Sequence, residues 1–383
     1  MTAFVTGASG YIGSRLVSAL VSQGENVAVG SRNPDGLVDF DWYDSVRAVR
    51  LDVTEAESCV DALSSGDIDV AYYLVHAIGE SGYRATDLKS ARHFAEAARD
   101  AGIRRIVYLG GFVPEGEKLS EHLASRAEVG EALTIDGIEV VWLRAAIVIG
   151  AGSTSFEMMR YLADRLPVLP LPTWLNKPVQ PIAVDDVVHY LAATASSDVP
   201  AGAYDIAGPE ILPYRDLVFA YVHAADLHRL GVPAPGVPTK LAAMVIGRLI
   251  PVPGLLADDL VQSLSNSMTA SENRISQYVS DPDGGLTGVD DAMRRSLLGG
   301  TPRGLAKTPD SLRLVDSDAE WTGGDARSIA RRGAELLSED GWKLAEALGA
   351  GTVLYSWPVA PVVRTNLDVI AHVSSRVRGL LKF

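Results

Sequence analysis

Three glycines near the start of the chain have the spacing of a phosphate-binding turn. Gly7, Gly10 and Gly13 follow the apolar run of residues 3–6 and precede a segment with apolar residues at helical spacing. In a strand–turn–helix unit the first glycine permits the tight turn, the second lets the backbone approach a diphosphate, and the third lets the helix pack on the strand. N–H groups at the helix start can then bind the anion. We therefore expect a dinucleotide site formed by Gly7, Ser9, Gly10, Tyr11, Ile12 and Gly13.

The residues after the second expected strand indicate which dinucleotide binds. Ser31 and Arg32 stand where NAD-binding proteins place an acidic residue for the ribose hydroxyls. A hydroxyl and a guanidinium suit the 2′-phosphate of NADP instead. Arg32 could also be a solvated loop charge, and Asp35 and Asp39 keep NAD as an alternative. We therefore expect NADP as the cofactor, with NAD as the second choice.

Two further strand ends supply candidate cofactor contacts. Asp52 and Val53 follow the third expected strand, and His76 and Ala77 follow the fourth. Open α/β sheets bind ligands at the carboxyl ends of their strands. Asp52 is expected to point toward the adenine end of the nucleotide, to cap the next helix, or to do both. His76 is expected to line the pocket rather than to catalyse.

Alternating strands and helices must position these residues. Five strand–helix units before residue 150 predict an α/β protein with a doubly wound parallel sheet of the Rossmann type. Helices are expected over residues 86–101 and 119–134, with Ser120 as an N-cap. The expected strands cover residues 3–6, 26–29, 46–51, 69–75, 104–109 and 138–143.

The second half of the chain is less regular. Residues 167–181 are Pro-rich and predict an irregular loop over a pocket, and Asp185–Asp186 is expected to cap a helix over residues 184–195. The apolar stretch 241–256 is expected to form helices that cover the cofactor cleft. We divide the chain into an NAD(P)-binding core with the start of the substrate region (1–230), a helical substrate-side extension (231–325) and a C-terminal helical segment (326–383).

Composition limits the partners. The chain has 34 Lys and Arg against 48 Asp and Glu, a formal net charge of −14, which argues against nucleic acid as a partner. Cys59 is the only cysteine, so we expect no disulfide and no cysteine-based metal site, and a reducing cytoplasm fits. The first strand begins at once, so we expect no signal peptide. The stretch 241–256 is too short and too interrupted to span a bilayer.

Several runs, taken in chain order, resemble the short-chain dehydrogenase/reductase superfamily in its extended and atypical branches. The resemblance is closest to bacterial NAD(P)H-binding proteins of the NmrA-like group, on residues 72–76 and 153–162. The other matching runs are residues 5–13, 51–53, 76–77, 143–150, 181–187 and 204–210.

The resemblance also exposes a departure. Active members carry a Ser or Thr after the fifth strand and a Tyr and a Lys four residues apart on the next helix. Here Gly110 and Gly111 occupy the first place, and His122 and Arg126 occupy the second. His122 could act as an acid or base near neutrality, and Arg126 could hold a ribose while favouring neutral His122. Both could instead be polar surface residues. Ala145 is expected near the reactive end of the cofactor.

The resemblance implies an NADP-dependent oxidoreductase that moves hydride between nicotinamide and a carbonyl, alcohol or enone. An apolar cover over the cofactor favours a hydrophobic, lipid-like small molecule as the substrate. The alternative is a non-catalytic NADP(H)-binding sensor, which the missing Tyr and Lys favour. An epimerase or dehydratase is a weaker alternative. A basic amphipathic helix over residues 368–382 could touch a membrane, or dock on its own domain or on a partner subunit.

Overall fold

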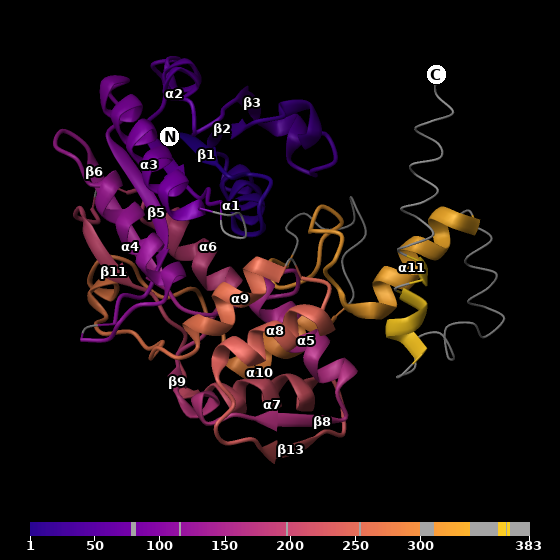
Figure 1. Cartoon of the computed structure of the whole chain (residues 1–383). Helices are drawn as coiled ribbons and strands as arrows, with labels where there is room; N and C mark the ends of the chain where they lie inside the picture. The colour runs from indigo at the N-terminus through magenta and orange to yellow at the C-terminus, as the bar shows by residue number, and fades with distance from the viewer. Residues whose placement is uncertain are drawn as a thin grey trace.

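A seven-stranded parallel sheet forms the centre of the molecule (Figure 1). The computed structural model describes residues 1–77, 82–114, 116–196, 198–252, 254–298, 310–337, 359–364 and 366–367. The strand order is β11-β6-β5-β4-β1-β2-β3, which confirms the doubly wound Rossmann-type sheet. The strands are β1 (Thr2–Thr6), β2 (Asn26–Ser31), β3 (Arg47–Arg50), β4 (Val70–Tyr73), β5 (Arg105–Gly111), β6 (Glu139–Ala145) and β11 (Gly202–Asp205).

Helices cover both faces of this sheet because its strands are apolar on both sides. Phe4 and Ala28 face one helix layer, whereas Val5 and Val29, the next residues along their strands, face the other. One layer contains α2 (Ala56–Leu63), α3 (Tyr83–Asp100) and α4 (Glu121–Leu133). The other contains α1 (Tyr11–Ser22) and α6 (Val184–Ala193). As predicted, the hydroxyl of Ser120 caps α4 by accepting from the N–H of Leu123.

A second region, which follows β6 along the chain, is built from helices and pairs of short strands. It contacts the carboxyl edge of the sheet and lies in the lower half of Figure 1. Its helices are α5 (Thr154–Arg165), α7 (Tyr214–Ala224), α8 (Thr239–Leu249), α9 (Gly254–Ser263), α10 (Val289–Leu297) and α11 (Gly324–Leu337). Its strand pairs are β7 (Val148–Ile149) with β10 (Ile182–Ala183), β9 (Pro178–Val179) with β12 (Leu212–Pro213), and β8 (Val168–Leu171) with β13 (Leu230–Pro233).

Two predictions for this region are wrong. Residues 167–181 are not an irregular loop, because β8 and β9 within them pair with strands that come more than 30 residues later in sequence. The Asp185–Asp186 pair lies in the first turn of α6, as expected for partners of the helix dipole, but it does not cap the helix, whose N-cap residue is Ala183. Asp185 instead pairs with Arg295 at 2.9 Å, and Asp186 accepts from the N–H of Thr287. The local sequence cannot indicate these partners, since they lie about a hundred residues away.

A buried ion pair ties the second region to α1. The guanidinium of Arg15 donates to both carboxylate oxygens of Asp318, at 2.8 and 2.9 Å, and both side chains are only 4% exposed. Arg15 also donates to the carbonyl oxygens of Ser311 and Arg313. The helix that follows the glycine turn is therefore held in place by a segment about 300 residues further along the chain.

The basic helix predicted over residues 368–382 falls outside the described residues. Residues 359–364 are helical and pack on α11, where Ala360 contacts Ile329 and Arg364 pairs with Asp325 at 3.1 Å. Within the described ranges, none of the helices has both the length and the apolar content needed to cross a bilayer.

Candidate functional site: a nucleotide cleft joined to an apolar pocket

The glycine turn between β1 and α1 has the conformation that the sequence predicts. Gly7 adopts a left-handed backbone with φ +65°, and a Cβ there would lie 2.7 Å from the carbonyl oxygen of Leu74. A Cβ at Gly13 would overlap the carbonyl oxygen of Gly7. Gly10 is the N-cap of α1, and no side chain among the described residues caps this helix. The first-turn N–H groups are therefore left for an anion, which fits a bound diphosphate.

A cleft of about 410 Å³ opens beside this turn at the carboxyl edge of the sheet. We call it the nucleotide cleft. It brings together most of the predicted cofactor contacts: Gly7, Ser9, Ser31, Arg32, Asp52, Val53, His76 and Ala77. The other lining residues are Gly30, Asn33, Gly36, Leu37, Leu51, Thr54, Tyr73, Val75, Thr86, Asp87 and Ser90. Strand ends that are far apart in sequence meet here because parallel strands end on the same edge.

Asp52 lies in the nucleotide cleft and does not cap α2. Its Oδ1 accepts hydrogen bonds from the N–H and the hydroxyl of Thr54, at 3.0 and 2.7 Å, whereas α2 begins after Glu55. The helix-cap alternative for Asp52 is therefore wrong. The bonds from Thr54, together with the positive charges of Arg32 and Arg50, lower the pKa of Asp52. The cleft thus presents an ionised carboxylate close to a guanidinium, two groups that can bind ribose hydroxyls and a phosphate.

Five predicted contacts are not in the lining of the nucleotide cleft, and one of them, Ala145, lines a neighbouring pocket. Gly10 and Gly13 belong to the glycine turn itself, as described above. The ring of Tyr11 is directed away from the cleft: Arg15 stacks 4.0 Å from its centroid, and a Cβ at Gly150 would overlap its hydroxyl. Ile12 lines the neighbouring pocket instead.

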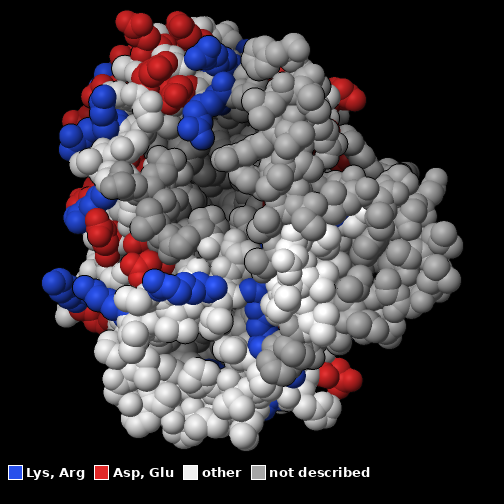
Figure 2. Space-filling view, turned by 45° about the vertical axis from the view of Figure 1, so that its right-hand side comes forward, with Lys and Arg blue, Asp and Glu red and all other residues white. Residues whose placement is uncertain are grey.

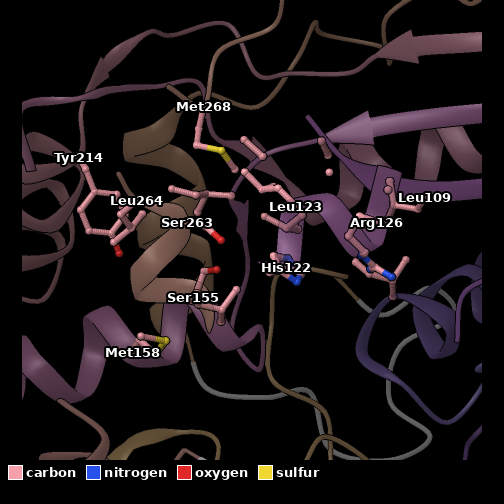
Figure 3. Close-up of a pocket in the computed structure, with 18 residues that line it drawn as sticks. Leu109, His122, Leu123, Arg126, Ser155, Met158, Tyr214, Ser263, Leu264 and Met268 are labelled. Carbon is pink, nitrogen blue, oxygen red and sulfur yellow. The ribbon is translucent and has the colours of Figure 1, made fainter. Parts of the chain in front are cut away.

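This neighbouring pocket, which we call the apolar pocket, has a volume of about 180 Å³ (Figure 3). It lies between β5, β6, α4 and the second region, and it contains the predicted residues His122, Arg126 and Ala145. Sequence reasoning missed Ser155, Tyr214, Ser263 and Met268. They come from four separate segments of the second region, with no motif to connect them. The remaining lining residues are Leu109, Gly110, Gly111, Leu123, Ala146, Ile147, Val148, Met158, Leu260 and Leu264.

His122 and Arg126 are half-buried and face the apolar pocket from successive turns of α4 (Figure 3). In this view Ser155 and Ser263 lie on one side of His122 and Arg126 lies on the other. Burial, reinforced by the charge of Arg126, lowers the pKa of His122 to about 3. The imidazole is therefore neutral at physiological pH, as predicted from its cationic neighbour, and it does not titrate near neutrality.

His76 lies within the electrostatic influence of residues of the apolar pocket. It lines the nucleotide cleft, whereas His122 and Arg126 line the apolar pocket. Desolvation by the surrounding protein, with the positive charges of Arg126 and His122 added, lowers the pKa of His76 well below its usual value. Ser9 of the glycine turn lines the nucleotide cleft and Ile12, three residues further along the chain, lines the apolar pocket, so the two cavities are neighbours.

Packing accounts for the glycines that replace the Ser or Thr after β5. A Cβ at Gly110 would overlap the indole nitrogen of Trp142, and one at Gly111 would lie 3.1 Å from Leu123. The ring of Trp142 also packs on Gly130 of α4 and lies 6.0 Å from the ring of Tyr108. A hydroxyl side chain at Gly110 would therefore displace this aromatic cluster.

The second region is fixed to α4 beside His122 by polar contacts. The hydroxyls of Ser120 and Ser263 lie 2.8 Å apart, and Asn266 donates to Glu117 at 3.0 Å. These bonds hold the end of α9 over the apolar pocket. Among the residues that the structure describes, no three His, Cys, Asp or Glu side chains are grouped so as to hold a metal ion.

Comparisons with known proteins agree with this geometry. Residues 7–134 match a family described as NAD(P)H-binding. The chain is 30% identical over 202 residues to a ceramide reductase of Caulobacter vibrioides, covering 51% of this chain and 61% of that protein. It is 31% identical over 117 residues to a sterol demethylase protein B of Methylococcus capsulatus, covering 29% of this chain and 35% of that protein.

Solved structures share the fold at low identity. A nucleoside-diphosphate-sugar epimerase of Staphylococcus aureus has a TM-score of 0.60 at 17% identity, over 77% of this chain and all of that chain. The Bordetella bronchiseptica enzyme WbmH, solved with NAD⁺, has a TM-score of 0.59 at 15% identity, over 76% of this chain and 96% of that chain.

Proposed function

Because this chain carries an NAD(P)H-binding domain in the fold of the short-chain dehydrogenase/reductase superfamily, we propose that it is an NADP-dependent oxidoreductase. It would transfer hydride between nicotinamide and a hydrophobic carbonyl, alcohol or enone. One observation carries the proposal: the glycine turn lines both cavities, with Ser9 in the nucleotide cleft and Ile12 in the apolar pocket that contains His122 and Arg126. A cofactor in the cleft would have its reactive end at the mouth of an apolar cavity.

The chain's own residues have separate roles in this proposal. Gly7, Ser9 and the start of α1 bind the diphosphate, and Ser31 with Arg32 binds the 2′-phosphate. The bound cofactor supplies or accepts the hydride. Arg126 holds the nicotinamide ribose or the developing charge on the substrate oxygen. His122 is neutral and donates an N–H hydrogen bond to that oxygen, while water supplies the proton. Ala145 leaves room for the ring.

The lining of the apolar pocket supports a lipid-like substrate. Leu123, Ile147 and Met158 offer apolar contact, and the hydroxyls of Ser155 and Ser263 offer a few polar contacts near His122. The names of two relatives, a ceramide reductase and a sterol demethylase protein, point to the same class of small molecule. A lone, buried Cys59 fits a reaction in the reducing cytoplasm.

The test is direct transfer of deuterium. Purified protein is incubated with NADPH deuterated at nicotinamide C4 and a panel of long-chain ketones, aldehydes and enones, and products are analysed by mass spectrometry. We expect deuterium in at least one product, a strongly reduced rate for Arg126→Met, and a smaller reduction for His122→Gln. A His122→Gln protein with the wild-type rate would remove His122 from the mechanism.

A non-catalytic NADP(H) sensor is the second candidate, and one observation favours it. A His122 pKa of about 3 leaves no imidazolium to act as the acid at neutral pH. Saturable NADPH binding without deuterium transfer to any member of the panel would support the sensor over the enzyme. The epimerase or dehydratase alternative is weaker, because the helix after the fifth strand lacks the Tyr and Lys of that branch.

A further inference from the structure

Helix α8 (Thr239–Leu249) is apolar on two sides. One side packs against other helices, and the other is exposed. On the inner side Ala243 is 2% exposed and packs in a cluster with Met158 and Tyr161 of α5. On the outer side Leu241, Met244 and Val245 are 50%, 55% and 48% exposed. These three residues are spaced i, i+3 and i+4, so they form one stripe along the helix. This stripe is the outer face of α8.

The chain around α8 is positively charged, whereas the protein as a whole is negatively charged. Residues 227–253 contain Arg229, Lys240 and Arg248 and no Asp or Glu, in a chain whose net charge is −14. Two of these cations, Lys240 and Arg248, lie on α8 itself. Figure 2 shows the lower part of the molecule, at the height of α7, α8 and β13 in Figure 1, as mostly uncharged, with blue Lys and Arg side chains near its border and few red ones.

An exposed apolar stripe flanked by cations fits the surface of an anionic membrane. Apolar side chains enter the boundary between headgroups and acyl chains, and Lys or Arg near an anionic surface contributes about 1 kcal/mol each. A second copy of the chain is a poorer occupant. The whole of α8 is roughly 16 Å long and 10 Å wide, so its outer face is far below the roughly 800 Å² per partner of a stable interface, and the cations of two copies would repel each other.

We propose that α8 docks this protein on anionic lipid bilayers, with Leu241, Met244 and Val245 in the interface. The proposal does not depend on the oxidoreductase function or on the C-terminal segment. It does place the membrane near the candidate site, because α9 packs on α8 and supplies Leu260 and Ser263 to the apolar pocket. Docking would bring the wall of that pocket close to the lipid phase.

The test is flotation of the full chain with vesicles of phosphatidylcholine alone or with a quarter of phosphatidylglycerol, at low salt and without nucleotide. We expect binding to the anionic vesicles only. Met244→Glu should reduce the bound fraction at least tenfold, and Lys240→Ala about fivefold, the equivalent of about 1 kcal/mol. Val60→Glu is the matched control, since Val60 is 54% exposed on α2, and it should bind as wild type.

Three results would overturn the proposal. The first is wild-type binding by Met244→Glu, which would assign the contact to another surface, such as the basic C-terminal residues. The second is no binding to anionic vesicles by the wild-type chain. The third is a dimer, measured by light scattering without lipid, that Met244→Glu dissociates. NADPH binding by each variant shows whether it is folded, and it keeps a failure of docking separate from a failure of the proposed function.

Discussion

The nucleotide half of the molecule and the second region are held together in different ways. In β1 to β6 with α1 to α4, apolar side chains alternate along strands and repeat along helices, and the strands are four to seven residues long. After β6, strands of only two residues form separate two-stranded pairs, and buried charges join the parts. Arg15–Asp318 and Arg165–Asp325 are two such pairs.

We call the nucleotide half the frame, and the contacts that fix the second region to it the attachments. The frame depends on apolar burial, which tolerates moderate changes if volume is kept. The attachments depend on specific pairs of charges, and removing one partner leaves the other buried without compensation. The turn that would bind the diphosphate belongs to the frame, whereas much of the apolar pocket belongs to the attached region. We therefore expect binding of the nucleotide and retention of the pocket to respond to different substitutions.

The largest expected effect is that of a substitution at Gly13, because the glycine turn has no space for a Cβ there. Gly13→Ala would place a Cβ against the backbone carbonyl of Gly7, so the turn must shift away from its anion-binding shape. We expect at least a hundredfold loss of NADPH affinity, about 3 kcal/mol, measured by calorimetry. Ser18→Ala, further along α1, should bind as wild type. A Gly13→Ala protein with unchanged affinity would show that this turn does not hold the diphosphate.

The next effect contrasts a buried ion pair with an exposed one. Asp318→Asn leaves the buried guanidinium of Arg15 without its carboxylate, and we expect the free energy of unfolding to fall by about 3 kcal/mol or more. The pair Arg47–Asp67 is 46% and 58% exposed, so Asp67→Asn should cost less than about 1 kcal/mol. Urea denaturation measures both. Equal losses would contradict the distinction between frame and attachments.

The same distinction explains how much the sequence could predict. The strands β1 to β6 and the Ser120 cap were predictable because they are local patterns of apolar and capping residues. The glycine turn predicted the position of the nucleotide cleft, because the other strand ends that line the cleft lie at the same edge of the parallel sheet. Ser155, Tyr214 and Ser263 were not predictable, because only the folded second region brings them to the apolar pocket. The partners of Asp185 and Asp186 were missed for the same reason.

A smaller effect on nucleotide binding is expected for Arg32, a residue of the frame that would contact only the nucleotide. Arg32 lies exposed in the nucleotide cleft, so Arg32→Ala should leave the melting temperature unchanged. It should weaken NADPH binding about tenfold, in line with the loss of one charge-assisted hydrogen bond, and leave NADH binding as it is. Arg50→Ala, a neighbouring loss of charge outside the cleft lining, is the control. Equal affinities of Arg32→Ala and wild type for both nucleotides would remove the 2′-phosphate assignment.

The smallest expected effect is a pH dependence that belongs to the second region. Burial raises the pKa of Asp164 to about 6, although the Tyr221 hydroxyl donates to its Oδ1 at 2.9 Å. Because the folded-state pKa is raised above the ordinary value of 3.8, folding favours the protonated carboxyl. The stability this gives is complete below about pH 4 and is lost as the pH rises through 6.

Asp164→Asn keeps an oxygen for Tyr221 but carries no charge. Relative to wild type, the variant should therefore gain about 1 kcal/mol of unfolding free energy between pH 5 and pH 8. Urea denaturation at the two pH values measures this gain, and Asp67→Asn in the frame serves as the comparison. A wild-type pH profile for Asp164→Asn would mean that the second region accommodates this carboxylate as readily as water does.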